Sequence, residues 1–552
     1  MRRHIFVAVS IAVLTLVGYF QFPGHTYLQS DSQIYLPMLE RFWDPAVLGR
    51  DFMVQRPHMA FTIYDEVALA LRRLTGLGFQ EVLTFQQLIF RALGLLGIFL
   101  IASSLKLGAR MSLLVTSIFA LGATIGGATV LTIEYEPVPR AFALPLIFLA
   151  VGLISHGRDL AAGVAASLAF LYHPTTTLVF WAVYFCLACW PAGPSVMRRR
   201  ILGLMPLLAG VLVLLLFSRL QTGETQSPVF LSRIDPPWEK LLKLRATYVW
   251  VSMWFSWWYW HYVLLWIVSL TAFWRLRKEA CPDLRFFLVG MPLLGILSIP
   301  ASYLLLEVWK SALGPQLQPA REVLFVAALA GLLSAVAGIK AAQAGRGVES
   351  FLWFLGAFVI PTGSPVQHVF LRSFGDPLMR RRLLLVVMLS AGAALAAWAQ
   401  SARRRSSIPA WAALVLVPFF LYPGYGKVVN STPLRSQDLD ELSRWARSST
   451  ALDAVFLFPD AGRDLYPGVF RTHALRAVYV DWKGGGQANY LPGVGQEWWK
   501  RWQAVMAPKF KPGKTARYST YGVDYVVVKR KNRPAGEQPV LENSSFAVYR
   551  AR

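Results

Sequence analysis

Long apolar stretches separated by short polar segments occupy most of this chain. They fall at roughly 5–20, 82–105, 111–131, 141–155, 160–172, 174–190, 201–218, 251–274, 286–306, 321–339, 351–362, 383–399 and 408–422. A helix needs about 20 mostly apolar residues to cross about 30 Å of hydrocarbon. The pattern therefore predicts a polytopic α-helical membrane protein with about 11–13 transmembrane helices, some of them broken.

One break is visible within 160–190, where His173 and Pro174 interrupt the apolar pattern. A proline inside a helix removes a backbone hydrogen bond, and broken helices are tolerated in membranes where they line a cavity. We therefore expect two short helices that meet at this point.

The composition excludes a water-soluble multidomain enzyme. Of 552 residues, 55% are hydrophobic and 15% are charged, whereas soluble domains carry about 25% charged residues. The net charge of +25 is compatible in principle with nucleic acid, but many basic residues sit in short clusters between apolar stretches. This distribution favours contact with membrane lipids and no nucleic-acid partner.

The basic clusters also predict orientation, because cytoplasmic loops are rich in Lys and Arg. With the N-terminus in the cytoplasm, the opposite side receives the long loop 21–81, several short loops and the tail. The cluster Arg380–Arg382 disagrees with this assignment. If 351–371 is a hairpin, the tail becomes cytoplasmic, but we favour a multi-pass protein of the inner or plasma membrane with an extracytoplasmic tail.

The tail has the alternating pattern of a small α/β domain. Helical spacing over 439–446 is followed by strand-like segments at 454–457, 477–480, 525–528 and 546–549. We therefore divide the chain into a transmembrane module, 1–431, whose large first external loop is 21–81, and a soluble α/β domain, 432–552.

Polar residues near the predicted outer boundary are the candidates for chemistry. In the first loop, Asp31 precedes Tyr35 and Arg41 on an amphipathic segment. Together with the helix number, the long first loop and the external α/β tail, this pattern resembles the integral-membrane glycosyltransferases of the GT-C superfamily. The resemblance implies a polyprenyl-phosphate-linked sugar donor and gives Asp31 the role of contacting the acceptor or acting as its base. Asp31 is equally well placed to cap a helix.

A second cluster contains Glu134, Glu136 and Arg140, and carboxylates are costly to hold near lipid. The resemblance implies a second acid in this loop, so Glu134 and Glu136 join Asp31 as catalytic candidates; ordinary loop solvation is the alternative. Arg140 and Arg321 are candidates for holding the lipid phosphate, because a guanidinium matches phosphate oxygens. A local ion pair with Glu322 is the alternative for Arg321.

His173, at the helix break, can donate to a phosphate or a sugar hydroxyl, or bond a carbonyl freed by the proline. Arg56 and His58 add donors to the first loop as further substrate-binding candidates. Asp51 is expected to form a surface ion pair with Arg50 or Arg56.

Two acids can ligate Mg²⁺ or Mn²⁺ through oxygen, but the spacing does not require a metal. No oligosaccharyltransferase signature of the WWDYG type is present, and the run DWKGG at 481–485 is only superficially similar. The favoured function is transfer of a sugar from a polyprenyl-phosphate donor to an acceptor at the outer membrane face. A transporter or lipid flippase, or a non-catalytic envelope assembly protein, are the alternatives.

Overall fold

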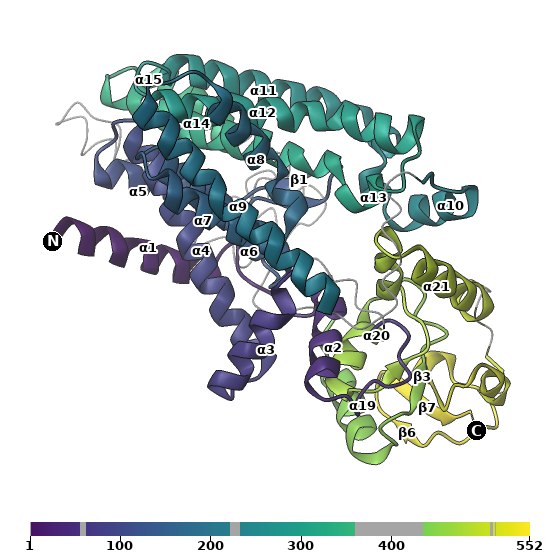
Figure 1. Cartoon of the computed structure of the whole chain (residues 1–552). Helices are drawn as coiled ribbons and strands as arrows, with labels where there is room; N and C mark the ends of the chain where they lie inside the picture. Colours follow the sequence, from purple (N-terminus) through teal and green to yellow (C-terminus); the bar gives the residue numbers. More distant parts are fainter. Residues whose placement is uncertain are drawn as a thin grey trace.

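The structure is a computed structural model that describes residues 2–55, 62–220, 232–358, 434–507, 510, 512–513 and 515–551. It has a helical part, formed by residues up to 358, and a C-terminal unit, residues 434–551. In Figure 1 the C-terminal unit, coloured green to yellow, lies at one end of the helical part.

An apolar helix overlaps each predicted membrane segment in the described residues. These helices are α1 (Arg2–Phe20), α4 (Phe79–Ser104), α5 (Ala109–Ala120), α6 (Pro139–Ile154), α7 (Asp159–Tyr172), α8 (Pro174–Cys189), α9 (Pro194–Leu220), α11 (Ser256–Leu276), α12 (Pro282–Tyr303), α14 (Val323–Gln343) and α15 (Gly347–Phe358). Within the residues that the structure describes, five segments are long and apolar enough to cross a membrane, and five shorter apolar helices accompany them. The chain is thus a multi-pass membrane protein, while the predicted segments 383–399 and 408–422 lie outside the described residues.

Two details of the helix prediction can be compared directly with the structure. The break at His173 is confirmed, since α7 ends at Tyr172 and α8 begins at Pro174. The prediction of one segment over 111–131 is wrong. Helix α5 ends at Ala120, and an antiparallel hairpin follows, formed by β1 (Thr124–Ile125) and β2 (Val130–Leu131). Gly127 takes a φ of 72° in the turn, a conformation that glycine adopts without steric cost.

Short elements connect the membrane helices and lie toward the C-terminal unit. The first loop contains α2 (Ser32–Trp43) and α3 (Tyr64–Thr75). Later connections contain α10 (Pro236–Arg245), η1 (Thr247–Val249), η2 (Val251–Met253), the π-helical turn η3 (Leu304–Val308), α13 (Gly314–Leu317) and η4 (Pro319–Glu322).

The C-terminal unit is the predicted α/β structure. Its helical elements are α19 (Gln437–Ser449), α20 (Tyr466–Ala474), η6 (Lys483–Asn489), α21 (Pro492–Val505), η7 (Thr515–Tyr521) and η8 (Arg530–Asn532). Its strands are β3 (Val455–Leu457), β4 (Ala477–Val478), β5 (Tyr525–Lys529), β6 (Leu541–Glu542) and β7 (Phe546–Arg550), in the sheet order β4-β3-β5-β7-β6. The first three strands in this order are parallel and the rest antiparallel. All four predicted strand positions are confirmed.

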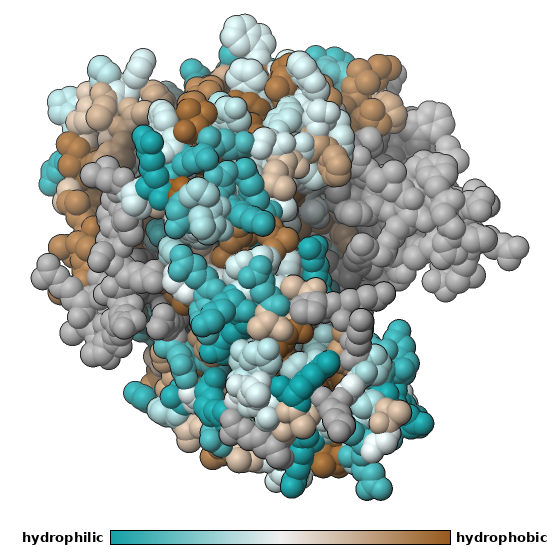
Figure 2. All heavy atoms as spheres, turned by 90° about the vertical axis from the view of Figure 1, so that its right-hand side faces the viewer, coloured by the Kyte–Doolittle hydropathy of each residue, from teal (hydrophilic) through white to brown (hydrophobic). Residues whose placement is uncertain are grey.

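The two parts contact each other through α2, which packs on α20, and through α10, which packs on η6 and α21. Figure 2 shows hydrophobic side chains along the outer edge of the helical part and mostly hydrophilic ones over the C-terminal unit below. This contrast fits a helical part that faces lipid and a C-terminal unit that faces water. The boundary predicted at 431/432 lies outside the described residues.

Candidate active site

A cavity of about 340 Å³ lies between the helical part and the C-terminal unit. Its walls come from the first loop, the β1–β2 hairpin, the segment 134–140, the 173 helix break, α10–η1, η4 and η6. Six sequence-predicted residues line it: Asp31, Glu134, Glu136, Arg140, His173 and Arg321. Arg56 and His58 lie outside the described residues. The cavity thus gathers polar side chains from segments that are far apart in the chain, and their roles stay predictions.

Asp31 occupies the N-cap position of α2, but its side chain makes no capping hydrogen bond. It is instead paired with the ammonium of Lys483, which also donates to Ser30 Oγ at 2.8 Å. The Asp31 side chain is 43% exposed, against 14% for Lys483. Burial in the cavity wall by itself raises the pKa of Asp31, but the Lys483 charge, helped by Arg140 and Arg321, lowers it below its usual value. Asp31 is therefore an ionised carboxylate that is open to the cavity.

Glu136 performs the capping that Asp31 does not. Its carboxylate accepts hydrogen bonds from the backbone N–H of Ser30 at 2.7 Å, the N–H of Asp31 at 2.8 Å and the Ser32 hydroxyl at 2.7 Å. Burial and the nearby Asp31 charge raise the pKa of Glu136. A carboxylate is favourable at this place because the free N–H groups and the positive end of the helix dipole meet there. Glu136 thereby fixes the backbone that carries Asp31.

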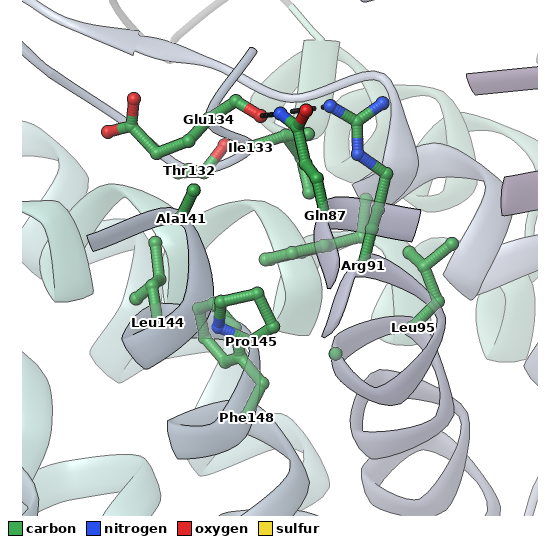
Figure 3. A pocket seen from close by; sticks show the side chains of 12 residues that line it. Gln87, Arg91, Leu95, Thr132, Ile133, Glu134, Ala141, Leu144, Pro145 and Phe148 are labelled. Atoms are coloured by element: carbon green, nitrogen blue, oxygen red, sulfur yellow. Dashed lines mark hydrogen bonds between the residues drawn. The ribbon is translucent and has the colours of Figure 1, made fainter. Parts of the chain in front are cut away.

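Glu134 and Arg140 neutralise each other, with 2.6 Å between Arg140 Nε and Glu134 Oε1. The main-chain oxygen of Glu134 accepts from Gln87 Nε2 at 3.2 Å and from Arg91 Nη2 at 2.9 Å. Figure 3 shows that the Glu134 carboxylate points away from these two donors, which lie beside a much smaller pocket of about 20 Å³. The backbone of Glu134 is therefore anchored to α4, and its side chain holds Arg140.

His173 caps α8, because its Nδ1 accepts from the Thr176 backbone N–H at 3.4 Å. Arg321, on η4, lies over the ring of Tyr248 with 4.4 Å between its Cζ and the ring centroid. No ion pair joins Arg321 to Glu322 or to another carboxylate in the described part of the chain, and its buried Nε has no hydrogen-bond partner there. Arg321 is therefore a cavity cation that is available to an anion.

Sequence reasoning missed a second such cation, Arg245, at the end of α10. Its guanidinium lies 3.8 Å from the ring centroid of Trp482 and 5.3 Å from that of Trp498. A Cβ on Gly485 would stand 2.7 Å from Arg245 Nε, so only a glycine admits the arginine here. Burial lowers the pKa of Arg245 to about 10. The glycine run 484–486 was the available signal, since consecutive glycines often mark a close approach of the backbone to another group.

The cavity wall from the C-terminal unit was missed as well. It consists of Lys483, Gly486, Gln487, Asn489 and Tyr490. Asn489 Nδ2 donates to the Tyr248 hydroxyl at 2.9 Å, and burial raises the pKa of Tyr490 to about 12. The hydrogen bond from Asn489 connects the C-terminal wall to Tyr248 of η1, over whose ring Arg321 lies.

The expected surface ion pair of Asp51 is wrong. Asp51 is fully buried, and its Oδ2 accepts from Arg471 Nε at 2.7 Å, while Arg471 Nη2 donates to Asp481 at 2.8 Å. Arg50 pairs instead with Asp524. Asp51 was misjudged because its partner stands 420 residues away, where a local pattern carries no information. We call Asp51, Arg471 and Asp481 the buried triad.

A divalent metal ion fits the cavity acids poorly. Asp31 and Glu134 are each bound to a cationic side chain, and the Glu136 oxygens accept three hydrogen bonds. Hard cations such as Mg²⁺ need several free oxygen ligands. The described residues contain no group of three His, Cys, Asp or Glu side chains arranged for a metal. We derive no step through a metal ion.

Comparison with solved structures finds two that resemble this chain, and the first of them shares its fold. The crystal structure of ArnT from Cupriavidus metallidurans in the apo state matches with a TM-score of 0.52 and 12% identity, over 99% of this chain and 96% of that one. The cryo-EM structure of the arabinofuranosyltransferase AftD from Mycobacteria has a TM-score of 0.42 and 15% identity, over 99% of this chain and 40% of that one. The likeness to ArnT shows that this chain shares the fold of that protein, as the architecture expected from the sequence requires.

Comparisons of sequence add one match. Residues 437–505, within the C-terminal unit, match a family described as a domain of unknown function, DUF6798. The search among curated proteins found no match to the chain.

Proposed function

We propose that this protein is a membrane glycosyltransferase that moves a sugar from a polyprenyl-phosphate donor to an acceptor at the outer face of the membrane. The observation that carries the proposal is that one cavity is lined by both an ionised carboxylate, Asp31, and an available guanidinium, Arg321. Transfer of a sugar from a lipid phosphate requires both kinds of group. One group must receive the acceptor's proton, and another must meet the charge of the leaving phosphate.

In the proposed reaction, a bond forms between the acceptor's nucleophilic atom and the anomeric carbon. The bond from that carbon to the phosphate oxygen breaks, and the lipid phosphate keeps the electron pair. Arg321 binds the phosphate as this charge develops, since its planar fork can donate two parallel hydrogen bonds. Asp31 takes the acceptor's proton.

Asp31 is a weak base while Lys483 holds its pKa low. We therefore infer that the acceptor replaces the Lys483 ammonium at the Asp31 carboxylate. The 43% exposure of Asp31 leaves room for such an exchange. Once the ammonium has moved away, the carboxylate becomes more basic, because the charge that depressed its pKa is more distant.

Glu136 and Glu134 act in this proposal through other groups. Glu136 holds the N–H groups of Ser30 and Asp31 and so sets the position of the Asp31 carboxylate. Glu134 keeps Arg140 in the cavity wall, and His173 holds the start of α8 beside it. In the proposed orientation the N-terminus is cytoplasmic and the C-terminal unit is extracytoplasmic, which a reporter joined after Tyr549 tests directly.

The decisive experiment is the substitution Asp31→Asn in the full-length protein reconstituted in liposomes. We expect transfer of label from a polyprenyl-phosphate sugar to acceptor-containing membranes to fall by about 10²-fold or more, the usual contribution of a general base. The matched control is Asp44→Asn at the opposite end of α2, where the side chain bonds only its own loop. Equal transfer by the two variants would contradict the role of Asp31. Export of the labelled lipid without transfer would favour a flippase instead.

A further inference from the structure

The cations of the cavity fall into two classes. Lys483 and Arg140 are each paired with a carboxylate, Asp31 and Glu134 respectively. Arg321 and Arg245 have no carboxylate partner among the described residues, and the Nε of each is buried without a hydrogen bond. The proposed function uses Arg321 for the donor phosphate and leaves Arg245 without a role.

Arg245 is held in place by several independent contacts. The rings of Trp482 and Trp498 pack against its guanidinium, and the Gly485 backbone passes beside it. Arg463 also contacts the Trp482 ring, but it is exposed and does not line the cavity. Packing of this kind fixes the direction of the guanidinium before a ligand arrives.

Keeping a partly buried guanidinium without an anionic partner among the described residues is unfavourable, because removal from water penalises the charged form. Burial accordingly lowers the pKa of Arg245. An oxyanion that entered the cavity, which Arg245 lines, would supply the missing anionic partner. Binding of an anion would relieve this unfavourable burial of charge, which favours affinity for an anion.

The surroundings of the two arginines differ. Arg321 belongs to η4, at the start of the membrane helix α14, and shares a small adjoining pocket with His173 and Gln318. Arg245 belongs to the loop element α10 and contacts η6 of the C-terminal unit. One faces the membrane wall of the cavity, and the other faces the wall from the C-terminal unit.

We propose that Arg245 forms a second oxyanion site, which binds a phosphate or carboxylate group carried by the acceptor. The identification of the bound group as part of the acceptor rests on the proposed function, but the existence of the anion site does not. The enzyme would then join two anionic substrates, a lipid phosphate at Arg321 and an anionic acceptor at Arg245. The charge of the acceptor, rather than its sugar or lipid structure alone, would determine its recognition.

The test measures binding to the purified full-length protein in phosphatidylcholine nanodiscs. Inorganic phosphate and acetate are the soluble probes, and a polyprenyl monophosphate is the lipid probe. We expect the wild type to bind a soluble anion while saturated with polyprenyl phosphate. Arg245→Gln should weaken soluble-anion binding about tenfold and leave the affinity for polyprenyl phosphate within about twofold. Arg321→Gln should do the reverse.

Arg463→Gln is the matched control, because Arg463 contacts the same Trp482 ring but lies outside the cavity. This variant should change neither affinity.

Nanodiscs containing phosphatidate distinguish the two possible sources of the anion. Competition between phosphatidate and the soluble anion identifies a lipid headgroup as the ligand, and absence of competition identifies a soluble acceptor. Unchanged anion binding in Arg245→Gln would overturn the inference. An equal loss of affinity for the soluble anion and for polyprenyl phosphate would also overturn it, because the two arginines would then bind the same group.

The two proposals fail separately. Absence of polyprenyl-phosphate binding in the wild type contradicts the proposed donor, while the Arg245-dependent anion site is still measured by inorganic phosphate alone. Conversely, loss of the anion site with intact lipid binding and transfer contradicts only the second oxyanion site.

Discussion

Two of the sets of charges that join the first loop to the C-terminal unit differ strongly in burial. In the buried triad, the side chains of Asp51 and Arg471 are 0% exposed and that of Asp481 is 1% exposed. In the second set, Asp31 is 43% exposed and meets Lys483 at the cavity. Both sets connect the same two parts of the molecule, and Asp481 and Lys483 are two residues apart.

The difference in burial gives the two sets different roles: the buried triad stabilises the structure, and the Asp31–Lys483 pair is the one that can exchange partners. A buried ion pair cannot exchange its partner for water, so the triad holds the start of η6 in one position. Asp481 also accepts from the Gly484 backbone N–H at 3.2 Å. An exposed pair can exchange its partner at little cost, so the Asp31–Lys483 pair can open for a substrate. The triad thus positions the lysine, and the lysine controls the carboxylate.

The largest effect on stability is expected from Arg471→Met. The variant leaves two buried carboxylates without their cationic partner, and removing one member of a buried ion network costs about 3–5 kcal/mol. Thermal unfolding of the full-length protein in detergent measures the loss. Arg435→Met, which removes an ion pair whose arginine is 55% exposed, should change the free energy of unfolding by less than about 1 kcal/mol. Equal effects of the two variants would refute the distinction between the sets.

An intermediate effect is expected from Glu136→Gln. The amide group has one acceptor oxygen and directs an NH₂ group at N–H donors that the carboxylate now satisfies, which costs about 1–3 kcal/mol at a buried site. Hydrogen exchange at the amides of Ser30 and Asp31 should accelerate, and sugar transfer should fall with it. Glu40→Gln, also on α2, disturbs a partly exposed pair with Arg72 of α3 and should leave these amides protected. Unchanged exchange in Glu136→Gln would show that α2 does not depend on this cap.

The smallest effect on stability, with a clear effect on pH dependence, is expected from Lys483→Met. Because the folded-state pKa of Asp31 is lowered, the pair stabilises the protein above the unfolded carboxylate pKa of about 3.9. That contribution is lost as the pH falls through the lower folded-state pKa. Asp31 is 43% exposed, so solvent limits the contribution to about 1 kcal/mol or less.

Without the lysine, the pKa of Asp31 rises, because burial then acts with less opposition. The acid limb of the pH–activity profile should therefore move to higher pH in Lys483→Met, while Arg471→Met should lower activity without moving that limb in the same way. The profile of labelled-sugar transfer measures both. An acid limb that stays in place in Lys483→Met would separate Asp31 from the rate-determining proton transfer.

The sequence by itself determined the membrane helices, the break at His173, the α/β tail with its strands, and polar candidates such as Asp31 and Arg321. Each of these rests on a local signal: apolar periodicity, a proline in an apolar stretch, or a charged residue beside a membrane segment. The end of α5 was misjudged because an apolar run does not by itself distinguish a helix from a buried hairpin.

Only the tertiary structure decided which charges meet. Lys483 reaches Asp31 across 452 residues of chain, and Arg471 reaches Asp51 across 420. It also decided that Glu136 caps α2, while Asp31 at the cap position stays open to the cavity. Among the described residues, it places Arg245 against Trp482 and Gly485 with no carboxylate partner. A side chain's electrostatic environment is set by its neighbours in space, and contacts between distant segments leave no periodic trace in the sequence.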